Sequence, residues 1–300
     1  MEVLETILTR LASTSDCGYQ QNSFAATEPT AWTALALLAH GRHAAAQACC
    51  DRLLEFQQSD GSLSVEASQD SPGWPTGLAL LAWQQAQQNP IAHAKYKMAS
   101  DRGLAWMLTI RGQFNERITW QGSNTPIQGW PWVDGTHTWL EPTAFNVLAL
   151  KHLGLAEHQR TREATLLLVN RLLERGGCNY GNTFVFGQEL RSHLEPTGLC
   201  LLALAGEEDT TGRITAAIQY LQRELSARTA TASLSYGLLG LAAHSALPPD
   251  YQAWLVTAAS RTLARDGGSY KLALVALALL GTNCPMITTA RSIPSQTLVG

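Results

Sequence analysis

Short, strongly apolar segments alternate with longer amphipathic segments along most of the chain. The apolar segments are rich in Ala and Leu, as in EPTAWTALALLAHG from Glu28, and they lack a polar face. In the amphipathic segments, such as HAAAQACCDRLLEFQQ at residues 43–58, apolar residues recur with the spacing of a half-exposed helix. A helix that is apolar on all sides is buried. The pattern therefore predicts an all-α fold with one buried and one half-exposed set of helices.

The apolar segment occurs six times along the chain, which is typical of a repeat architecture. Its copies begin at Glu28, Trp74, Glu141, Glu195, Thr231 and Ser269. Six amphipathic segments alternate with them, the first at the N-terminus. We expect a single α/α toroid of about six helix hairpins over residues 1–282, with an inner and an outer ring of helices. Residues 283–300 lack periodicity and are expected to form a C-terminal tail.

Three of the apolar segments begin with Glu-Pro-Thr, at Glu28, Glu141 and Glu195. In an alternating ring, all inner helices run in one direction, so the loops that precede them gather at one end. The three glutamates are therefore predicted to meet at one cavity mouth. A Pro in the first turn and a Gly after the last apolar residue, such as Gly41 or Gly154, are typical of helix boundaries.

Composition excludes several classes of partner. Only 15% of residues are charged and the net charge is −3, so the chain lacks the excess of positive charge that is typical of proteins that bind nucleic acid. No segment is long and apolar enough to span a membrane, although an apolar surface could make peripheral contact with lipid. The N-terminus lacks the features of a secretory signal, and no C-x-x-C motif is present. These features favour a cytoplasmic location.

Three turn segments carry a family resemblance. FQQSDGSL at 56–63, ERGGCNYGN at 174–182 and ARDGGSY at 264–270 resemble the Q-x-x-D-G-G-W-type turn that ends an outer helix in squalene–hopene cyclases. EPTAFNVLAL from Glu141 resembles the inner helix that follows. The chain thus resembles the terpenoid cyclase and protein prenyltransferase superfamily, with its prenyltransferase and squalene-oxidase repeat. This resemblance implies an apolar central cavity and a cyclase, isomerase or prenyl-transfer activity on an isoprenoid.

Class II terpene cyclases carry D-x-D-D-T-A at such an inner-helix start, and its middle Asp protonates an alkene or an epoxide. WLEPTA at 139–144, aligned on Thr-Ala, has Glu141 in the place of that acid. Trp139 and Pro142 replace the flanking aspartates, so the full motif is absent. The resemblance implies that Glu141 is a proton donor or metal ligand and that Glu28 and Glu195 share or tune this role. Asp134 is a further carboxylate in the preceding loop.

The three glutamates have two interpretations. A Glu cap followed by Pro, stabilised by the helix dipole, would explain them as helix starts. Glu is a poor cap, however, so its longer carboxylate is a candidate to reach into the cavity. Burial and mutual repulsion would then raise the pKa values and make a general acid. Alternatively, carboxylates with imidazole could bind a divalent metal, with His137, His193 and Cys178 as candidate ligands. Beyond this possible divalent metal, the sequence leaves the cofactor unknown.

Aromatic residues crowd the loops before the inner helices. The candidates for substrate binding are Trp74, Trp120, Trp130, Trp132, Trp139, Tyr180, Phe184 and Phe186. They either plug one end of the toroid as a small core or line an apolar pocket, where their π faces would stabilise a carbocation. The second interpretation predicts a hydrophobic small molecule, an isoprenoid, as the partner.

Three functional hypotheses follow. The first is an isoprenoid-handling enzyme, with Glu141 as its central acid. The second is a non-catalytic toroid that binds a hydrophobic ligand or a protein and has lost the chemistry of the aspartate motif. The third is a carbohydrate-active (α/α)₆ enzyme, in which tryptophans stack on sugars and two carboxylates act as acid and base.

Overall fold

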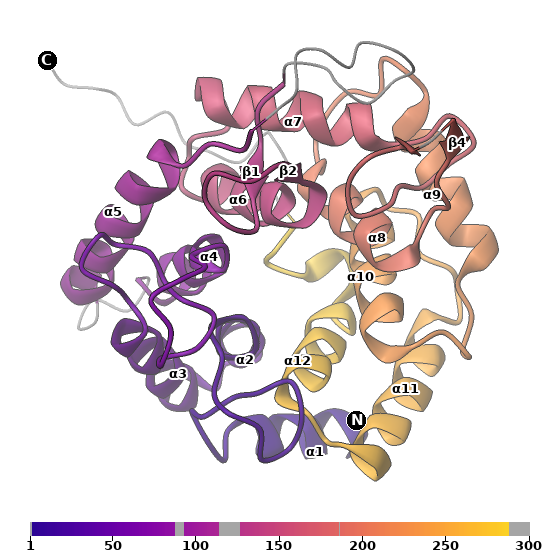
Figure 1. Cartoon of the computed structure of the whole chain (residues 1–300). Coiled ribbons are helices and arrows are strands. Elements are labelled where there is room, and N and C mark those ends of the chain that lie inside the picture. The colour runs from indigo at the N-terminus through magenta and orange to yellow at the C-terminus, as the bar shows by residue number, and fades with distance from the viewer. Residues whose placement is uncertain (1, 88–92, 114–126, 186, 288–300) are drawn as a thin grey trace, which may run out of the picture.

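The computed structural model describes residues 2–87, 93–113, 127–185 and 187–287. Within them, twelve α-helices form two concentric rings (Figure 1). The inner ring is α2 (Thr27–Ala39), α4 (Thr76–Ala86), α6 (Leu140–His152), α8 (Leu194–Ala203), α10 (Thr231–Ala243) and α12 (Ser269–Ala278). The outer ring is α1 (Glu2–Leu11), α3 (His43–Glu55), α5 (His93–Thr109), α7 (Gln159–Arg171), α9 (Arg213–Glu224) and α11 (Tyr251–Arg265). Each inner helix contacts the next, and α12 contacts α2, so the ring is closed. The predicted α/α toroid is confirmed.

The two rings differ in burial as their sequences predict. Almost every residue of α4 is buried, from Thr76 to Trp83. The outer helix α9, by contrast, buries one face through Ile214, Ala217 and Leu221, and its other residues are half-buried or exposed. Burial of apolar surface between the rings therefore supplies the main stabilising free energy of the fold.

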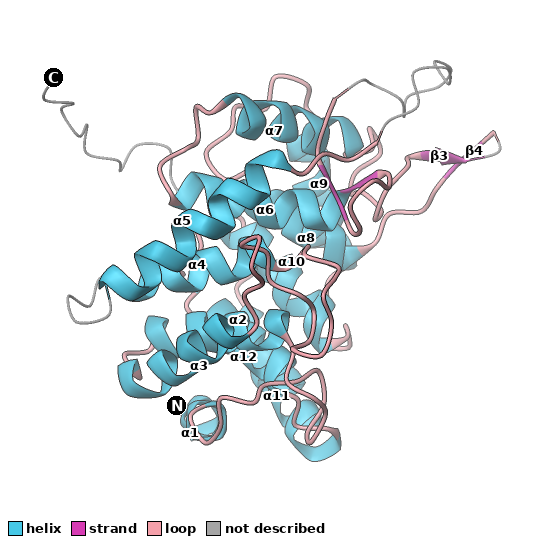
Figure 2. Cartoon of the chain, turned by 60° about the vertical axis from the view of Figure 1, so that its left-hand side comes forward, coloured by secondary structure: helices cyan, strands magenta, loops and turns pink. Residues whose placement is uncertain are grey.

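The inner helices all begin at the same end of the ring, where the loops gather. Two short hairpins lie among these loops. Strand β1 (Trp130–Pro131) pairs antiparallel with β2 (Thr138–Trp139), directly before α6. Strand β3 (Phe184–Val185) pairs with β4 (Gln188–Glu189) before α8, and this second hairpin projects from the body of the molecule (Figure 2).

The glutamates of the Glu-Pro-Thr segments are not the N-caps of their helices. The first of the two interpretations of the sequence, a Glu cap followed by Pro, is therefore wrong. The caps are the preceding residues Ala26, Trp139 and His193, so each Glu is the second residue of its helix. In these three helices, the side chain of the N-cap residue makes no hydrogen bond to the helix. Instead, the Thr hydroxyl donates to the cap carbonyl, at 2.6 Å from Thr143 Oγ1 to Trp139 O and 2.6 Å from Thr197 Oγ1 to His193 O. The Glu side chain is therefore free of any capping role.

The predicted helix ends are as the sequence indicates. Gly41 and Gly154 follow α2 and α6 with φ of +70° and +76°, in the left-handed region that glycine enters without strain. Each lets the chain reverse toward the next outer helix.

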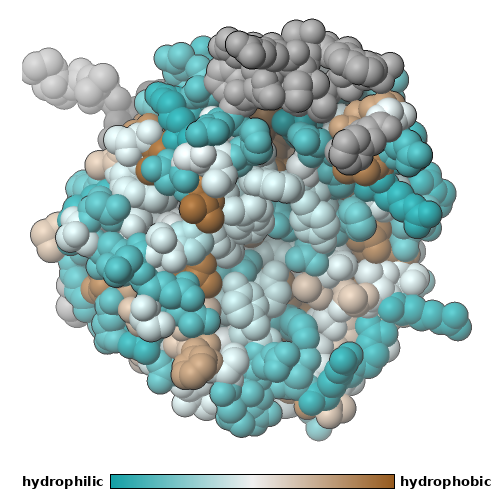
Figure 3. Space-filling model, in the orientation of Figure 1, coloured by the Kyte–Doolittle hydropathy of each residue, from teal (hydrophilic) through white to brown (hydrophobic). Residues whose placement is uncertain are grey.

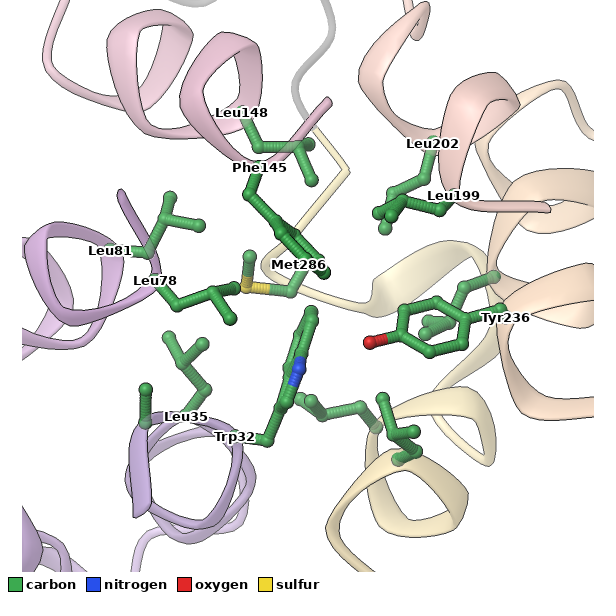
Figure 4. Close-up of a cluster of buried hydrophobic side chains, with 14 of the residues drawn as sticks. Trp32, Leu35, Leu78, Leu81, Phe145, Leu148, Leu199, Leu202, Tyr236 and Met286 are labelled. Carbon is green, nitrogen blue, oxygen red and sulfur yellow. The ribbon is translucent and has the colours of Figure 1, made fainter. Parts of the chain in front are cut away.

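Repeat-related side chains fill the barrel in layers. Four residues after the Glu position, Trp32, Leu78, Phe145 and Leu199 point inward, and Tyr236 joins them from α10 (Figure 4). A further layer, three residues on, contains Leu35, Leu81, Leu148 and Leu202. At the far end, a short 3₁₀ helix, η1 (Gly281–Asn283), leads to Met286, which is fully buried against these layers. The barrel is therefore a packed core below its first layer, and the part of the predicted tail up to residue 287 packs against it.

Candidate functional site

A cavity of about 370 Å³ lies at the end of the barrel where the inner helices begin. Its lining comprises Tyr19, Glu28, Trp74, Trp132, Glu141, Phe145, Glu195, Tyr236 and Tyr270. The structure thus brings all three Glu-Pro-Thr carboxyls to one place, although 113 and 54 residues separate them in turn along the chain. Figure 3, which views this face, shows a depression near its centre with near-neutral side chains around it.

The three carboxyls differ in their hydrogen bonds. Glu28, only 7% exposed, accepts a 2.6 Å bond at Oε2 from the Tyr19 hydroxyl. Glu195 accepts a 3.2 Å bond from the Ser233 hydroxyl. Glu141 accepts no hydrogen bond from the described residues, so its ionised form has the least support from the protein.

Burial and mutual repulsion raise the pKa values of all three carboxyls. The pKa of Glu141 rises to about 8, first through burial and then through the charges of Glu195 and Glu28. The pKa of Glu28 rises to about 7 through burial, because the lowering effect of the Tyr19 hydrogen bond offsets only part of that cost. Burial also raises the pKa of Glu195. At neutral pH, Glu141 is therefore mostly protonated, and it lies beside Glu28, which is partly ionised.

Aromatic rings form the walls and floor of the cavity. Trp74 meets Trp132 edge to face with ring centroids 4.6 Å apart, and it stacks on Phe145 at 5.9 Å. On the opposite side, Tyr19 and Tyr270 meet edge to face at 5.3 Å. The acids thus face π surfaces, which attract positive charge. No Lys, Arg or His is among the described residues that line the cavity.

The repeat explains which residues line this cavity. Aligned on the Pro-Thr pair, Trp74 occupies the position of the three glutamates, and Tyr270 is likewise the second residue of its helix. Phe145 and Tyr236 come from the layer four residues further on, where Trp32 also lies (Figure 4). Sequence reasoning missed Phe145, Tyr236 and Tyr270 as lining residues. Counting four residues from Glu141 finds Phe145, and aligning the fifth and sixth repeats by their helix starts finds Tyr236 and Tyr270.

The other predicted acid and metal candidates lie elsewhere. Asp134 is exposed, and its Oδ1 accepts a 2.9 Å bond from the Gly135 amide in a turn. His137 is also exposed. Cys178 is buried, with its amide donating to Thr197 Oγ1 at 2.9 Å. Among the described residues, no group of three or more His, Cys, Asp or Glu side chains is arranged to hold a metal ion.

The predicted aromatic residues divide into several groups. Trp74 and Trp132 line the acid cavity, whereas Trp139 and Tyr180 line a second pocket beside it, together with His193. Trp130 is 1% exposed and donates from Nε1 to Met107 O at 2.9 Å, so it belongs to the core. Phe184, half-buried in β3, lines neither pocket. Trp120 and Phe186 fall outside the described residues.

Comparison with known proteins shows relationship at the level of structure. No protein-family profile matches the chain, and no curated protein matches its sequence. Solved structures do. An α-amylase from Clostridium perfringens has a TM-score of 0.63 at 12% identity, over 93% of this chain and 97% of that one.

Two further structures bear on the site. The type II terpene cyclase MstE from Scytonema, in complex with its substrate geranylgeranyl dihydroxybenzoate, has a TM-score of 0.59 at 12% identity, over 95% and 98% of the two chains. An α-1,6-mannanase of Salegentibacter, in complex with α-1,6-mannotriose, has a TM-score of 0.59 at 11% identity, over 95% and 99%. The fold that these structures share with this chain is the α/α toroid. At these identities the likeness establishes the fold alone, and it is shared by enzymes of different chemistry.

The described helices include none with the length and apolar character that a membrane crossing requires.

Proposed function

We propose that this protein is an acid catalyst of the terpene-cyclase type, which protonates an alkene of an isoprenoid with Glu141 as the proton donor. One observation carries this proposal: three carboxyls with raised pKa values converge in one aromatic-walled cavity, and Glu141 keeps its proton at neutral pH. A general acid works best when its pKa lies near the working pH. A carboxyl in this range can donate a proton that an ordinary surface glutamate would already have lost.

The remaining groups suit the later steps of such a reaction. Proton transfer from Glu141 to an alkene carbon leaves a carboxylate on the enzyme and a carbocation on the substrate. The faces of Trp74, Trp132 and Phe145 would stabilise that cation, and a second alkene could close a ring onto it. Loss of a proton from the final cation to ionised Glu28 would end the reaction, and exchange of protons with solvent would then return Glu28 to its ionised form and Glu141 to its protonated form. The overall change is an isomerisation, so no oxidant, reductant or co-substrate is needed.

The size of the cavity restricts the substrate. A volume of about 370 Å³ lies at the small end of the range for ligand pockets. Below it, Trp32, Tyr236 and Phe145 are at most 3% exposed and fill the barrel. A short isoprenoid segment around the reacting alkene therefore fits better than a long polyene folded inside the toroid.

The experiment is incubation of the purified protein with isoprenoids of increasing length, from geraniol to squalene, followed by mass spectrometry of extracted products. We expect a product of unchanged mass and altered retention. Glu141→Gln should lower its rate by about 10²- to 10⁴-fold, the usual contribution of a general acid. Glu224→Gln, an exposed outer-helix carboxyl paired with Arg223, is the matched control. Equal rates for the Glu141→Gln protein and the wild type would reject Glu141 as the acid.

Glycoside hydrolysis is a second candidate, favoured by one observation. The cavity holds carboxyls of different pKa, as an acid and base pair requires, beside aromatic rings that can stack on sugars. The α-1,6-mannanase supports it at the level of fold. The polar groups of the lining side chains, however, are limited to the carboxyls, the tyrosine hydroxyls and the tryptophan N–H groups. The lining contains no other polar side chain that could bind sugar hydroxyls. Release of reducing sugar from manno-oligosaccharides, without any isoprenoid product, would favour this candidate over the first.

A further inference from the structure

The turn before each of the three glutamate helices is joined to the N-cap of its helix by an equivalent backbone contact. The contacts are Cys17 O to the Ala26 amide at 2.9 Å, Cys178 O to the His193 amide at 2.8 Å, and the antiparallel pair Trp130–Trp139. Two residues after Cys17, Cys178 and Trp130 stand Tyr19, Tyr180 and Trp132, respectively. These three aromatic side chains therefore hold equivalent places in the repeat, one before each glutamate.

Among the described residues, only the first of these side chains donates a hydrogen bond to its glutamate. The Tyr19 hydroxyl donates to Glu28 Oε2 at 2.6 Å. Trp132 lines the same cavity but has no hydroxyl, and Glu141 accepts no hydrogen bond from the part of the chain that the structure describes. The residue at this one place in the repeat thus distinguishes two carboxyls whose helices begin alike.

The third copy of this place has a tyrosine with a different contact. The Tyr180 ring lies against the ring of His193, the N-cap of α8, with centroids 5.3 Å apart. The N-cap of α2 is an alanine, which offers no ring to hold Tyr19 in the same way. Glu195 accepts its 3.2 Å bond from Ser233 of α10 instead. The contact between Tyr19 and its glutamate is therefore a feature of the first repeat and not of the repeat in general.

The first turn is fixed against the turn before α12. The Gln21 amide donates to Asp266 O at 3.1 Å. A Cβ atom on Gly268 would lie 2.3 Å from Tyr19 O, so only glycine lets the two turns lie this close. The Tyr19 ring also meets the Tyr270 ring edge to face, with centroids 5.3 Å apart. Backbone and ring contacts together fix where the Tyr19 hydroxyl lies.

The hydrogen bond supports the ionised form of Glu28. Burial, and then the charge of Glu28, raise the pKa of Tyr19 well above its usual range, so the phenol keeps its proton and acts as a donor. Burial raises the pKa of Glu28, and among the groups that lower it Tyr19 has the largest effect. The other titratable side chains whose charges or hydrogen bonds act on this pair are Glu66, Glu141, Glu195, Tyr236 and Tyr270.

We propose that Tyr19 is a positioning residue that makes Glu28, rather than Glu141, the proton acceptor of the cavity. This role rests on the proposed function, in which one carboxyl donates a proton and another accepts one. A hydrogen bond to a carboxylate stabilises it against its protonated form. Tyr19 supplies that bond to Glu28, whereas Trp132 in the equivalent place supplies none to Glu141. The side chains of the two turns therefore assign the roles of base and acid.

The test is carbon NMR of protein labelled with carbon-13 at the glutamate carboxyls. Tyr19→Phe keeps the ring at its contact with Tyr270 and removes only the hydroxyl. The Glu28 resonance, assigned by its loss in Glu28→Gln, should then titrate about one pH unit higher, because loss of a hydrogen bond to a charged group changes the equilibrium about tenfold. The Glu141 midpoint should not rise. Tyr180→Phe removes the hydroxyl of the equivalent tyrosine, and this matched control should leave the Glu28 midpoint unchanged.

The pH dependence of kcat/KM adds a readout that a purely structural role would not move. Its acidic limb reports the ionisation of the base in the free enzyme. Tyr19→Phe should therefore shift this limb upward together with the Glu28 midpoint, and it should not raise the alkaline limb that Glu141 sets. A mere loss of packing would lower the rate alike at every pH.

Three results would overturn the inference: a Glu28 midpoint that stays or falls in Tyr19→Phe, an equal rise in Tyr180→Phe, or an acidic limb that does not move. Failure of the proposed function is separable, because the carboxyl titrations need no substrate. If the wild type converts no isoprenoid, the midpoints still decide whether Tyr19 sets the order in which Glu28 and Glu141 ionise.

Discussion

At the scale of single residues, Glu141 has the clearest chemical character in the structure. Its side chain is half-buried, its neighbours are acids and aromatic rings, and no described group donates a hydrogen bond to it. The helix dipole favours an anion at this position, but burial and the two nearby glutamates outweigh it, since the pKa rises to about 8. Such a group is a functional candidate because it lowers stability when it ionises.

Because ionisation of Glu141 lowers the free energy of unfolding, we expect the effect of Glu141→Gln on stability to depend on pH. The folded pKa of Glu141, about 8, lies above its unfolded value, so the native state binds more protons between the two. Its contribution to stability is complete below the unfolded pKa of about 4.3 and is lost as the pH rises through about 8. Gln cannot ionise and escapes this loss. Thermal unfolding should show Glu141→Gln raising Tm by about 4 °C at pH 9. At pH 4 the two proteins should melt together, and a higher Tm of the wild type at pH 9 would contradict the pKa shift.

At the scale of elements, the threonine of Glu-Pro-Thr joins each inner helix to the turn before it. Thr143 Oγ1 donates to Trp139 O and accepts from the Trp130 amide at 2.9 Å. Thr197 repeats this arrangement with the Cys178 amide. The glutamate lies two residues earlier, so these bonds orient the helix start that carries the acid.

Removal of this hydroxyl should therefore be costly. Thr143→Val keeps the shape but leaves the buried Trp130 amide without its acceptor, at a cost of about 1–3 kcal/mol. Thr257→Val is the matched control: Thr257 donates to a carbonyl within the exposed face of α11, but no amide depends on it. Urea unfolding should show a lower midpoint for Thr143→Val alone. Equal losses in the two variants would show that the inter-element bond adds nothing.

The sequence predicted the elements well and the site in part. The alternation of apolar and amphipathic segments predicted six inner and six outer helices in a ring. The shared direction of the inner helices predicted that Glu28, Glu141 and Glu195 lie close together. The tryptophans were harder, because Trp130 and Trp132 lie two residues apart yet one enters the core and the other the cavity. Loop geometry decides such cases, and periodicity carries no information about it.

At the scale of the whole molecule, the toroid is closed below its cavity. Trp32, Phe145 and Met286 meet on the barrel axis (Figure 4), so in the part of the chain that the structure describes the barrel is closed to a ligand from the end opposite the acids. This distinguishes the protein from the open, deep toroid that a long polyene would require.

Enlarging the cavity at its floor should allow the protein to convert longer isoprenoids. Trp32→Leu removes a fully buried ring beneath the acids and should extend conversion to longer isoprenoids, at a stability cost of about 2–4 kcal/mol. Trp83→Leu removes an equally buried ring whose indole bonds to Cys50 O between α4 and α3, away from the axis. Product analysis over the same substrate panel compares the two. Extension in both variants, or in neither, would deny that Trp32 limits the cavity.

The most direct test of the whole account is the protonation state of the three converging glutamates. Carbon NMR of protein labelled with carbon-13 at the glutamate carboxyls would follow each titration. We predict three resonances with midpoints above the ordinary value of about 4.3, and the one lost in Glu141→Gln should titrate near pH 8. If every glutamate carboxyl titrated below about pH 5.5, as exposed groups do, the cavity would hold no acid at neutral pH and the proposed chemistry would fail.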